Sequence, residues 1–310
     1  MGLIFMSNQS IHLRRLVISA MFLAMALAMR YFAVYIPIFG VAGMRVGVSA
    51  IFSIPPAILF GPVYGLMVSG LTDLLGHFIR PSGQWLPLMT ILLATTGFLR
   101  GWFWIGVRNR SVKTLRIVVG AFASFVLLFV VIAQTMLRSD GITRAFFEGV
   151  EYPASIITAD MTIIGRMVIE RAQISPTPHN MLATTLNNFT LVPLIFVGLC
   201  LALLVIDFLL SAYLTNENGK PFTLMPLLLT MIIPGLYMNT LNTVILRETV
   251  WTSWQEVPFV VVWLPRATTL VLTYIVYTYI VAVLLEAFTR QKFLQPILLR
   301  KPTLVEAEEQ

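Results

Sequence analysis

Apolar residues fill this chain in runs of roughly twenty, rather than at the spacing of an amphipathic surface helix. The runs lie approximately at 14–36, 46–60, 62–79, 86–106, 114–137, 189–214, 223–246 and 262–288. They predict membrane-spanning helices, so we expect an all-α polytopic membrane protein. The second and third runs are short and are separated by Gly61 and Pro62, a pair that breaks a helix and predicts a tight reversal at a membrane surface.

Composition supports this interpretation. Hydrophobic residues make up 58% of the 310-residue chain and charged residues only 11%, which excludes a large globular domain. The excess of 21 Lys and Arg over 14 Asp and Glu reflects topology in a membrane protein and does not indicate nucleic-acid binding. The single cysteine, Cys200, excludes a disulfide framework, and the scattered histidines predict no metal site and no catalytic site.

Basic clusters predict the orientation. They precede the first apolar run and follow the fourth, sixth and eighth, which places them all on one side if every run spans. We therefore expect both termini in the cytoplasm, the stretch 138–188 outside, and the first run retained as a spanning helix rather than cleaved as a signal peptide.

Four arginines nevertheless fall in or near the predicted outer half. They are Arg30, Arg45, Arg80 and Arg266, and the carboxylate of Asp73 lies at a similar depth. An ionised group in a spanning helix costs roughly 2.5–3.5 kcal/mol and seldom faces lipid. A structural Arg–Asp pair would explain Arg30 and Asp73, and lipid headgroups would explain the others.

The second interpretation is a ligand cavity open to the outside. Asn242 supplies an amide at the same depth, and Tyr31 and Trp85 supply aromatic rings. Guanidinium, amide and aromatic groups together suit a planar, anionic, hydrogen-bonding ligand. An aromatic belt at the membrane surface is the simpler alternative for the tryptophan.

The first run also carries Ala20, Ala24 and Ala28 at intervals of four. Small residues at this spacing let two helix backbones approach closely and predict a docking face, although alanine is also common in membrane helices.

The order of motifs resembles the S components, the substrate-binding membrane subunits, of energy-coupling factor (ECF) vitamin transporters, and most closely the folate branch. The resemblance covers about 14–108 and, more weakly, 222–288. Its matching positions are Phe60, Gly61, Pro62, Gly65, Asp73, Gly76, Pro81 and Gly83.

This resemblance implies a six-helix core that captures a vitamin outside a bacterial cell membrane and docks, through an Ala-x-x-x-Ala motif, on one transmembrane coupling subunit and two ATPase subunits. It assigns substrate binding to Arg30 and Arg45, and also to Asn242 and Arg266. Where folate members have a Phe-Pro-Gly-Phe-Thr-like stretch this chain reads WLPLMT, so the vitamin stays open between folate and another small molecule.

The resemblance also predicts the organisation of the chain. We expect core helices one to four in 1–110, an inserted pair of helices with an extracellular loop in 111–221, core helices five and six in 222–290, and a cytoplasmic tail in 291–310.

Two other classes are less well supported. An intramembrane enzyme would need a catalytic motif, and the sequence has no His-Glu-x-x-His, no Gly-x-Ser-x-Gly and no paired acidic cluster. A stand-alone transporter would be expected to show a repeat between its halves, and none is seen. No Gly-x-x-x-x-Gly-Lys-Ser/Thr motif occurs either, so ATP dependence would come from partners, and no cofactor is expected.

Overall fold

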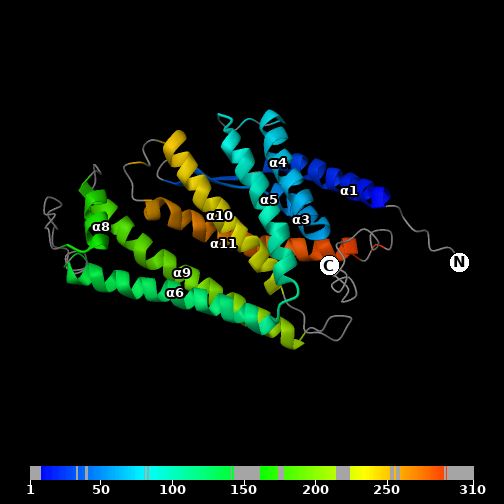
Figure 1. Ribbon diagram of the computed structural model, residues 1–310. Coiled ribbons are helices and arrows are strands. Elements are labelled where there is room, and N and C mark those ends of the chain that lie inside the picture. The colour runs from blue at the N-terminus through cyan, green and yellow to red at the C-terminus, as the bar shows by residue number, and fades with distance from the viewer. Residues whose placement is uncertain are drawn as a thin grey trace, which may run out of the picture. The chain divides into compact units, whose positions relative to one another are not determined.

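The computed structural model describes residues 8–32, 34–38, 41–79, 81, 84–140, 142, 161–173, 178–213, 224–251, 255, 259–289 and 291. Its elements are α1 (Asn8–Ala28), the 3-10 helix η1 (Met29–Phe32), β1 (Val34–Ile38), β2 (Val41–Val46), α2 (Ser49–Ser53), α3 (Pro55–Phe60), α4 (Pro62–Ile79), α5 (Pro87–Val107), α6 (Val112–Ser139), α8 (Ile163–Gln173), α9 (Pro178–Tyr213), α10 (Met225–Thr249) and α11 (Phe259–Thr289) (Figure 1). The structure is predominantly helical, as the apolar runs predict.

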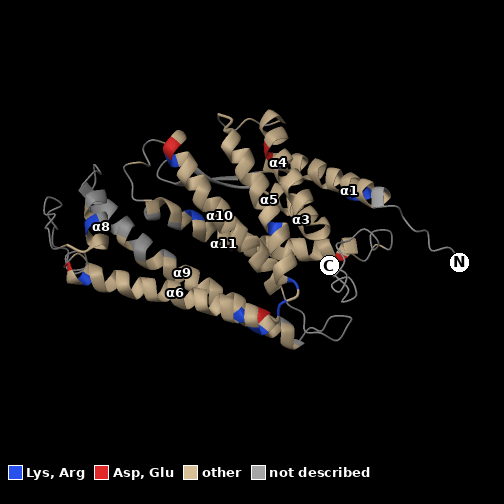
Figure 2. Cartoon of the chain, viewed as in Figure 1, with Lys and Arg blue, Asp and Glu red and all other residues tan. Residues whose placement is uncertain are grey.

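Five helices in the described part of the chain are long and apolar enough to cross a membrane. They cover 10–32, 87–107, 112–139, 225–249 and 265–289, and two shorter apolar helices cover 49–60 and 193–209. Figure 2 shows long uncharged stretches on these helices; in α6 the charges lie close to the two ends. The all-α polytopic membrane fold is thereby confirmed.

Three local predictions need correction. The first helix ends at Ala28 instead of continuing to residue 36, and β1 and β2 pair antiparallel where the first predicted run ends and the second begins. The segments 34–38 and 41–46 are rich in Val and Ile, whose branched side chains favour strands. The stretch 138–188 also contains α8 and the beginning of α9.

The chain forms two compact units, which we describe separately. Unit 1 consists of Met1–Arg110, Pro226–Met238 and Thr273–Gln310, and unit 2 of Ser111–Met225 and Asn239–Leu272. One boundary coincides with the predicted start of the insertion after residue 110. Unit 2 also includes 239–272, and the division of the chain into core helices and an inserted pair stays a prediction.

The centre of unit 1 is the crossing of α4 and α5, which lie side by side (Figure 1). A Cβ atom on Gly65 would stand 2.4 Å from the carbonyl oxygen of Gly97, and one on Gly97 would stand 2.1 Å from the carbonyl oxygen of Gly65. Neither backbone can move away cheaply, so only glycine fits at either position.

The reversal before α4 is fixed by the same crossing. Gly61 has φ 103°, a conformation that residues with a side chain rarely adopt. A Cβ on Gly101 of α5 would lie 2.6 Å from backbone atoms of Pro62. The absence of a side chain at Gly101 therefore lets the turn pack directly on α5. The predicted Gly-Pro reversal is therefore present and packed.

Helix α1 packs on this framework through one apolar face. Phe22 is fully buried and forms a cluster with Leu59 and Phe60 of α3. The ring of Phe288 from α11 lies 4.8 Å from the ring of Phe22, centroid to centroid. Helix α1 and the last turns of α11 thus pack against each other in unit 1.

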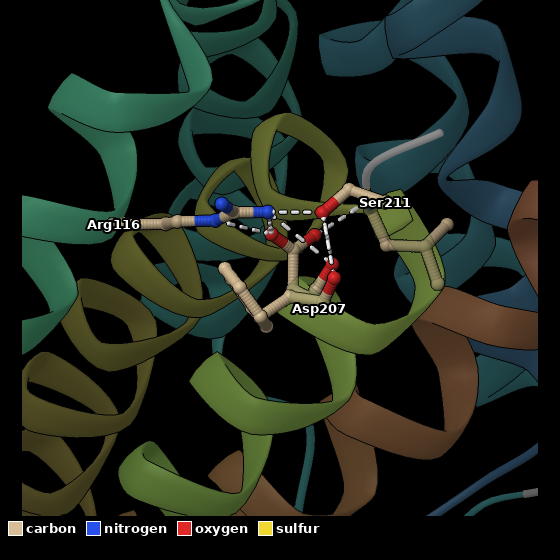
Figure 3. A network of polar contacts seen from close by, with 5 residues as sticks. Arg116, Asp207 and Ser211 are labelled. Carbon is tan, nitrogen blue, oxygen red and sulfur yellow. Dashed lines mark hydrogen bonds and ion pairs between the residues drawn. The ribbon is translucent and has the colours of Figure 1, made fainter. Parts of the chain in front are cut away.

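Unit 2 is built around α6 and α9, which lie side by side (Figure 1) and are joined by polar contacts along their length. Figure 3 shows the contacts of Arg116 with Asp207 and Ser211. The Nη2 of Arg116 lies 2.9 Å from Oδ2 of Asp207, whose other oxygen accepts a hydrogen bond from the amide of Leu224 at 3.3 Å. Farther along, Gln134 donates to the hydroxyl of Thr190. A buried carboxylate with this many partners has its desolvation cost offset.

The glycine crossing yields a prediction. Gly97→Leu should destabilise the protein by at least about 1–3 kcal/mol, because the new side chain meets the backbone of α4 rather than a movable side chain. Thermal unfolding in detergent would measure the effect. Gly106→Leu is the matched control: it lies on the same helix, and a Cβ there has no neighbour within 4 Å. Equal effects of the two variants would contradict the close-packing interpretation.

Candidate functional site

Arg30, a predicted site residue in unit 1, is buried, with an exposed fraction of 6%. It lies in η1, just beyond the end of α1. Its Nη1 donates to the carbonyl oxygen of Thr72 at 2.9 Å, and its Nη2 lies 3.7 Å from Oδ1 of Asp73. Two consecutive residues of α4 therefore bind the guanidinium group, and together they offset the cost of its charge in an apolar environment.

Gly76 makes room for this guanidinium. A Cβ at this position would lie 2.4 Å from Nη1 and 2.5 Å from Cδ of Arg30. The Asp-x-x-Gly motif thus has a physical explanation in this chain: Asp73 supplies the negative charge, and one turn later Gly76 leaves the space that the arginine occupies.

Asp73 also connects α4 to α5. Its Oδ2 accepts a hydrogen bond from the hydroxyl of Thr90 at 2.8 Å, and the indole nitrogen of Trp85 donates to the same hydroxyl at 3.3 Å. Trp85 is 41% exposed, so the chain of contacts leads from a buried cation to an aromatic ring that is accessible. Tyr31, next to Arg30, is also exposed.

Arg45 lies in β2, opposite Tyr35 of β1 in the strand register. The structure describes the backbone of this residue and not its side chain. Arg80 lies outside the described residues.

In unit 2, Asn242 and Arg266 are brought together. Nη2 of Arg266, which is buried, donates to Oδ1 of Asn242 at 3.0 Å. One turn of α11 earlier, the indole nitrogen of Trp263 donates to the hydroxyl of Thr240 at 2.8 Å. The carboxamide nitrogen of Asn239 is buried without a hydrogen-bond partner among the described residues.

The sequence-predicted residues therefore form two local groups. Arg30, Asp73 and Trp85 belong to unit 1, and Asn242 and Arg266 belong to unit 2. Each group has the composition expected of a polar site inside apolar helices. That both groups contact one ligand stays a prediction.

Sequence reasoning overlooked Arg100 of α5. Its exposed fraction is 4%, its Nη2 donates to the hydroxyl of Tyr274 at 2.6 Å, and its guanidinium carbon lies 5.6 Å from the centre of that ring. No carboxylate among the described residues pairs with it. A single arginine inside an apolar run was the available signal, because such a residue needs a buried partner.

The three alanines predicted to dock on a partner are exposed. Ala20, Ala24 and Ala28 lie on the side of α1 that Phe22 and Ala26 do not occupy, and both of those residues are fully buried. As for metals, the described residues contain no group of His, Cys, Asp and Glu that could hold an ion.

A family model described as "ECF-type riboflavin transporter, S component" matches residues 10–170, just over half of the chain. No curated protein and no solved structure matches. The chain therefore belongs to this family of transporter S components, which are not enzymes. The match includes 111–170, so it does not set this stretch apart, and neither the two-helix insertion nor the folate branch is confirmed.

Because Arg30 packs on Gly76, we expect Gly76→Ala to change the stability of the protein in opposite directions in the presence and in the absence of Arg30. Gly76→Ala should destabilise the wild-type protein by about 1 kcal/mol or more, because the methyl group displaces the guanidinium from Asp73. In an Arg30→Ala background the same change should stabilise by roughly 0.5–1 kcal/mol, the ordinary helix preference for alanine over glycine.

Unfolding free energies of the four proteins in this cycle measure the coupling. If Gly76→Ala has the same effect in both backgrounds, the glycine does not serve Arg30.

Proposed function

From this membership we propose that the chain is the substrate-binding subunit of an ECF transporter and that it captures a riboflavin-like vitamin. The observation that carries the proposal is the family match, which covers the whole group of Arg30, Asp73 and Trp85. Binding itself needs no ATP, and the ATPases that drive uptake are separate subunits, since the sequence has no phosphate-binding Gly-x-x-x-x-Gly-Lys-Ser/Thr motif.

The orientation that we propose follows the positive-inside rule. With the basic clusters near the chain ends in the cytoplasm of a bacterium, the junction of α4 and α5 that carries Asp73 and Trp85 faces outside. A vitamin arriving from outside would then meet Trp85 and Tyr31 before it reaches any buried group.

The charge arrangement favours a neutral ligand over an anionic one. The positive charge of Arg30 is offset by Asp73, so it is not free to balance a carboxylate of the ligand. Riboflavin is an uncharged planar ring system with a hydroxylated chain, and it needs stacking surfaces and hydrogen-bonding groups such as the indole of Trp85. Folate, which the sequence resemblance favours, carries carboxylates and would need a cation whose charge Asp73 does not offset.

We place the docking surface for the coupling subunit on α1. Its exposed face carries Ala20, Ala24 and Ala28, which have the smallest side chains available apart from glycine. A partner helix can approach such a face closely, and close approach is what stabilises helix pairs in lipid. The partners are one transmembrane coupling subunit and two ATPase subunits, as the family implies.

Ligand identity is tested by titration of the purified protein in detergent, without ATP. We expect saturable binding of riboflavin, with quenching of its fluorescence as Trp85 or Tyr31 stacks on the ring. Trp85→Ala should weaken this binding, whereas Trp102→Ala, which removes an exposed tryptophan from the other end of α5, should not. Tight binding of a reduced folate with no binding of riboflavin would overturn the neutral-ligand assignment and restore the folate prediction.

Docking is tested by bulk at the alanine face. Ala24→Trp should hold the partner helix away and reduce uptake in cells by about tenfold or more, while ligand binding in detergent stays unchanged. Ile91→Trp places the same indole at an exposed position of α5 and is the control. If Ala24→Trp leaves uptake intact, the docking face lies elsewhere, and if uptake proceeds in a host without ECF ATPases, the subunit assignment is wrong.

A further inference from the structure

The two strands β1 and β2, which we call the ribbon, lie between two polar anchors in unit 1. The first anchor is Arg30, which lies four residues before Val34, the first residue of β1. Its guanidinium group contacts Thr72 and Asp73. At the end, Gly47 follows Val46 directly, and its carbonyl oxygen accepts a hydrogen bond from the hydroxyl of Tyr277 at 3.1 Å.

Tyr277 reaches the ribbon from a distant part of the sequence. It lies on α11 and is 8% exposed. The carbonyl oxygen of Gly47 also accepts from the amide of Ala50 at 3.3 Å, in the first turn of α2. The hydroxyl of Tyr277 therefore binds the joint at which the ribbon ends and α2 begins.

The part of α11 that carries Tyr277 is itself held in place. Arg100 of α5 donates to the hydroxyl of Tyr274, one turn before Tyr277. The hydroxyl of Thr278 donates to the carbonyl oxygen of Tyr274 at 2.7 Å and lies 3.4 Å from the sulfur of Met231 in α10. The rings of Tyr274 and Tyr277 are 6.1 Å apart, centroid to centroid. Contacts to α5 and α10 thus restrict the position from which Tyr277 donates.

We infer that Tyr277 is a positioning residue for substrate binding: its hydroxyl fixes the end of the ribbon and thereby sets where Arg45 lies. The inference rests on the proposed function only in that Arg45, in β2, is a predicted ligand contact. Two short strands alone are at most marginally stable, so their position depends on what holds their ends. A single buried hydrogen bond at one end is sufficient to shift the population of the ordered ribbon by about fivefold.

The ribbon is tested first without a ligand, by hydrogen exchange of the full-length protein in detergent. Tyr277→Phe removes the hydroxyl and keeps the ring, and we expect amides in 41–50 to exchange about fivefold faster. Tyr64→Phe is the matched control, because it removes a hydroxyl that bonds Nδ1 of His12 at 3.1 Å, a contact between α1 and α4. Unchanged exchange in 41–50 for Tyr277→Phe, or an equal increase for both variants, would overturn the inference.

The second measurement is the dissociation rate of riboflavin, followed by fluorescence after dilution. Tyr277→Phe should release the ligand about fivefold faster with little change in the thermal unfolding midpoint, whereas a purely structural role would lower the midpoint and leave the dissociation rate unchanged. Should the wild-type protein bind no vitamin, the proposed function fails while the exchange experiment still decides the role of Tyr277. A wild-type protein that binds riboflavin, with a Tyr277→Phe variant that releases it at the same rate, would refute the positioning role alone.

Discussion

The close crossing of α4 and α5 determines the arrangement of the remainder of unit 1. Gly65 and Gly97 bring the two backbones into contact, and Gly101 admits the reversal at Gly61 and Pro62 on one side of that contact. On the other side, the two helices are near enough for Thr90 to donate to Asp73 across them. A side chain at either glycine would separate the helices by more than a hydrogen bond can span, so the polar group depends on the packing.

Charge inside apolar helices imposes the second constraint, and the described residues meet it in two ways. Asp73 and Asp207 each neutralise an arginine from another helix or turn. Arg100 has instead a phenol hydroxyl and the face of the same ring. An arginine opposite an aromatic ring keeps its positive charge, whereas an arginine opposite a carboxylate contributes almost no net charge to its surroundings. The partner therefore decides whether a buried arginine can attract an anion.

The sequence predicts the helical architecture well because runs of apolar residues report directly on burial in lipid. It also places Arg30 and Asp73 at one depth, since position along a helix converts to height at a fixed rise. It predicts less well where helices end: the residues after Ala28 are as apolar as those before, so the change from helix to strand depends on β-branched content rather than on hydrophobicity. The hydrogen-bond partners of buried polar groups are harder still to predict from the sequence, because the bond from Tyr277 to Gly47 joins residues 230 positions apart.

The same reasoning changes what the arginines imply about the substrate. Counted along the sequence, four cations near one membrane surface favour an anionic ligand. In the structure, Nη2 of Arg30 lies 3.7 Å from a carboxylate oxygen of Asp73, whereas Arg266 donates to the amide oxygen of Asn242, so the two arginines differ in the charge of their partners. A carboxylate ligand would have to compete with Asp73 for Arg30, so that the ligand and Asp73 together would place two negative charges beside one guanidinium group. A neutral planar ligand avoids this cost and could still stack on the exposed indole of Trp85, and on this ground we propose a neutral vitamin for the polar group of unit 1.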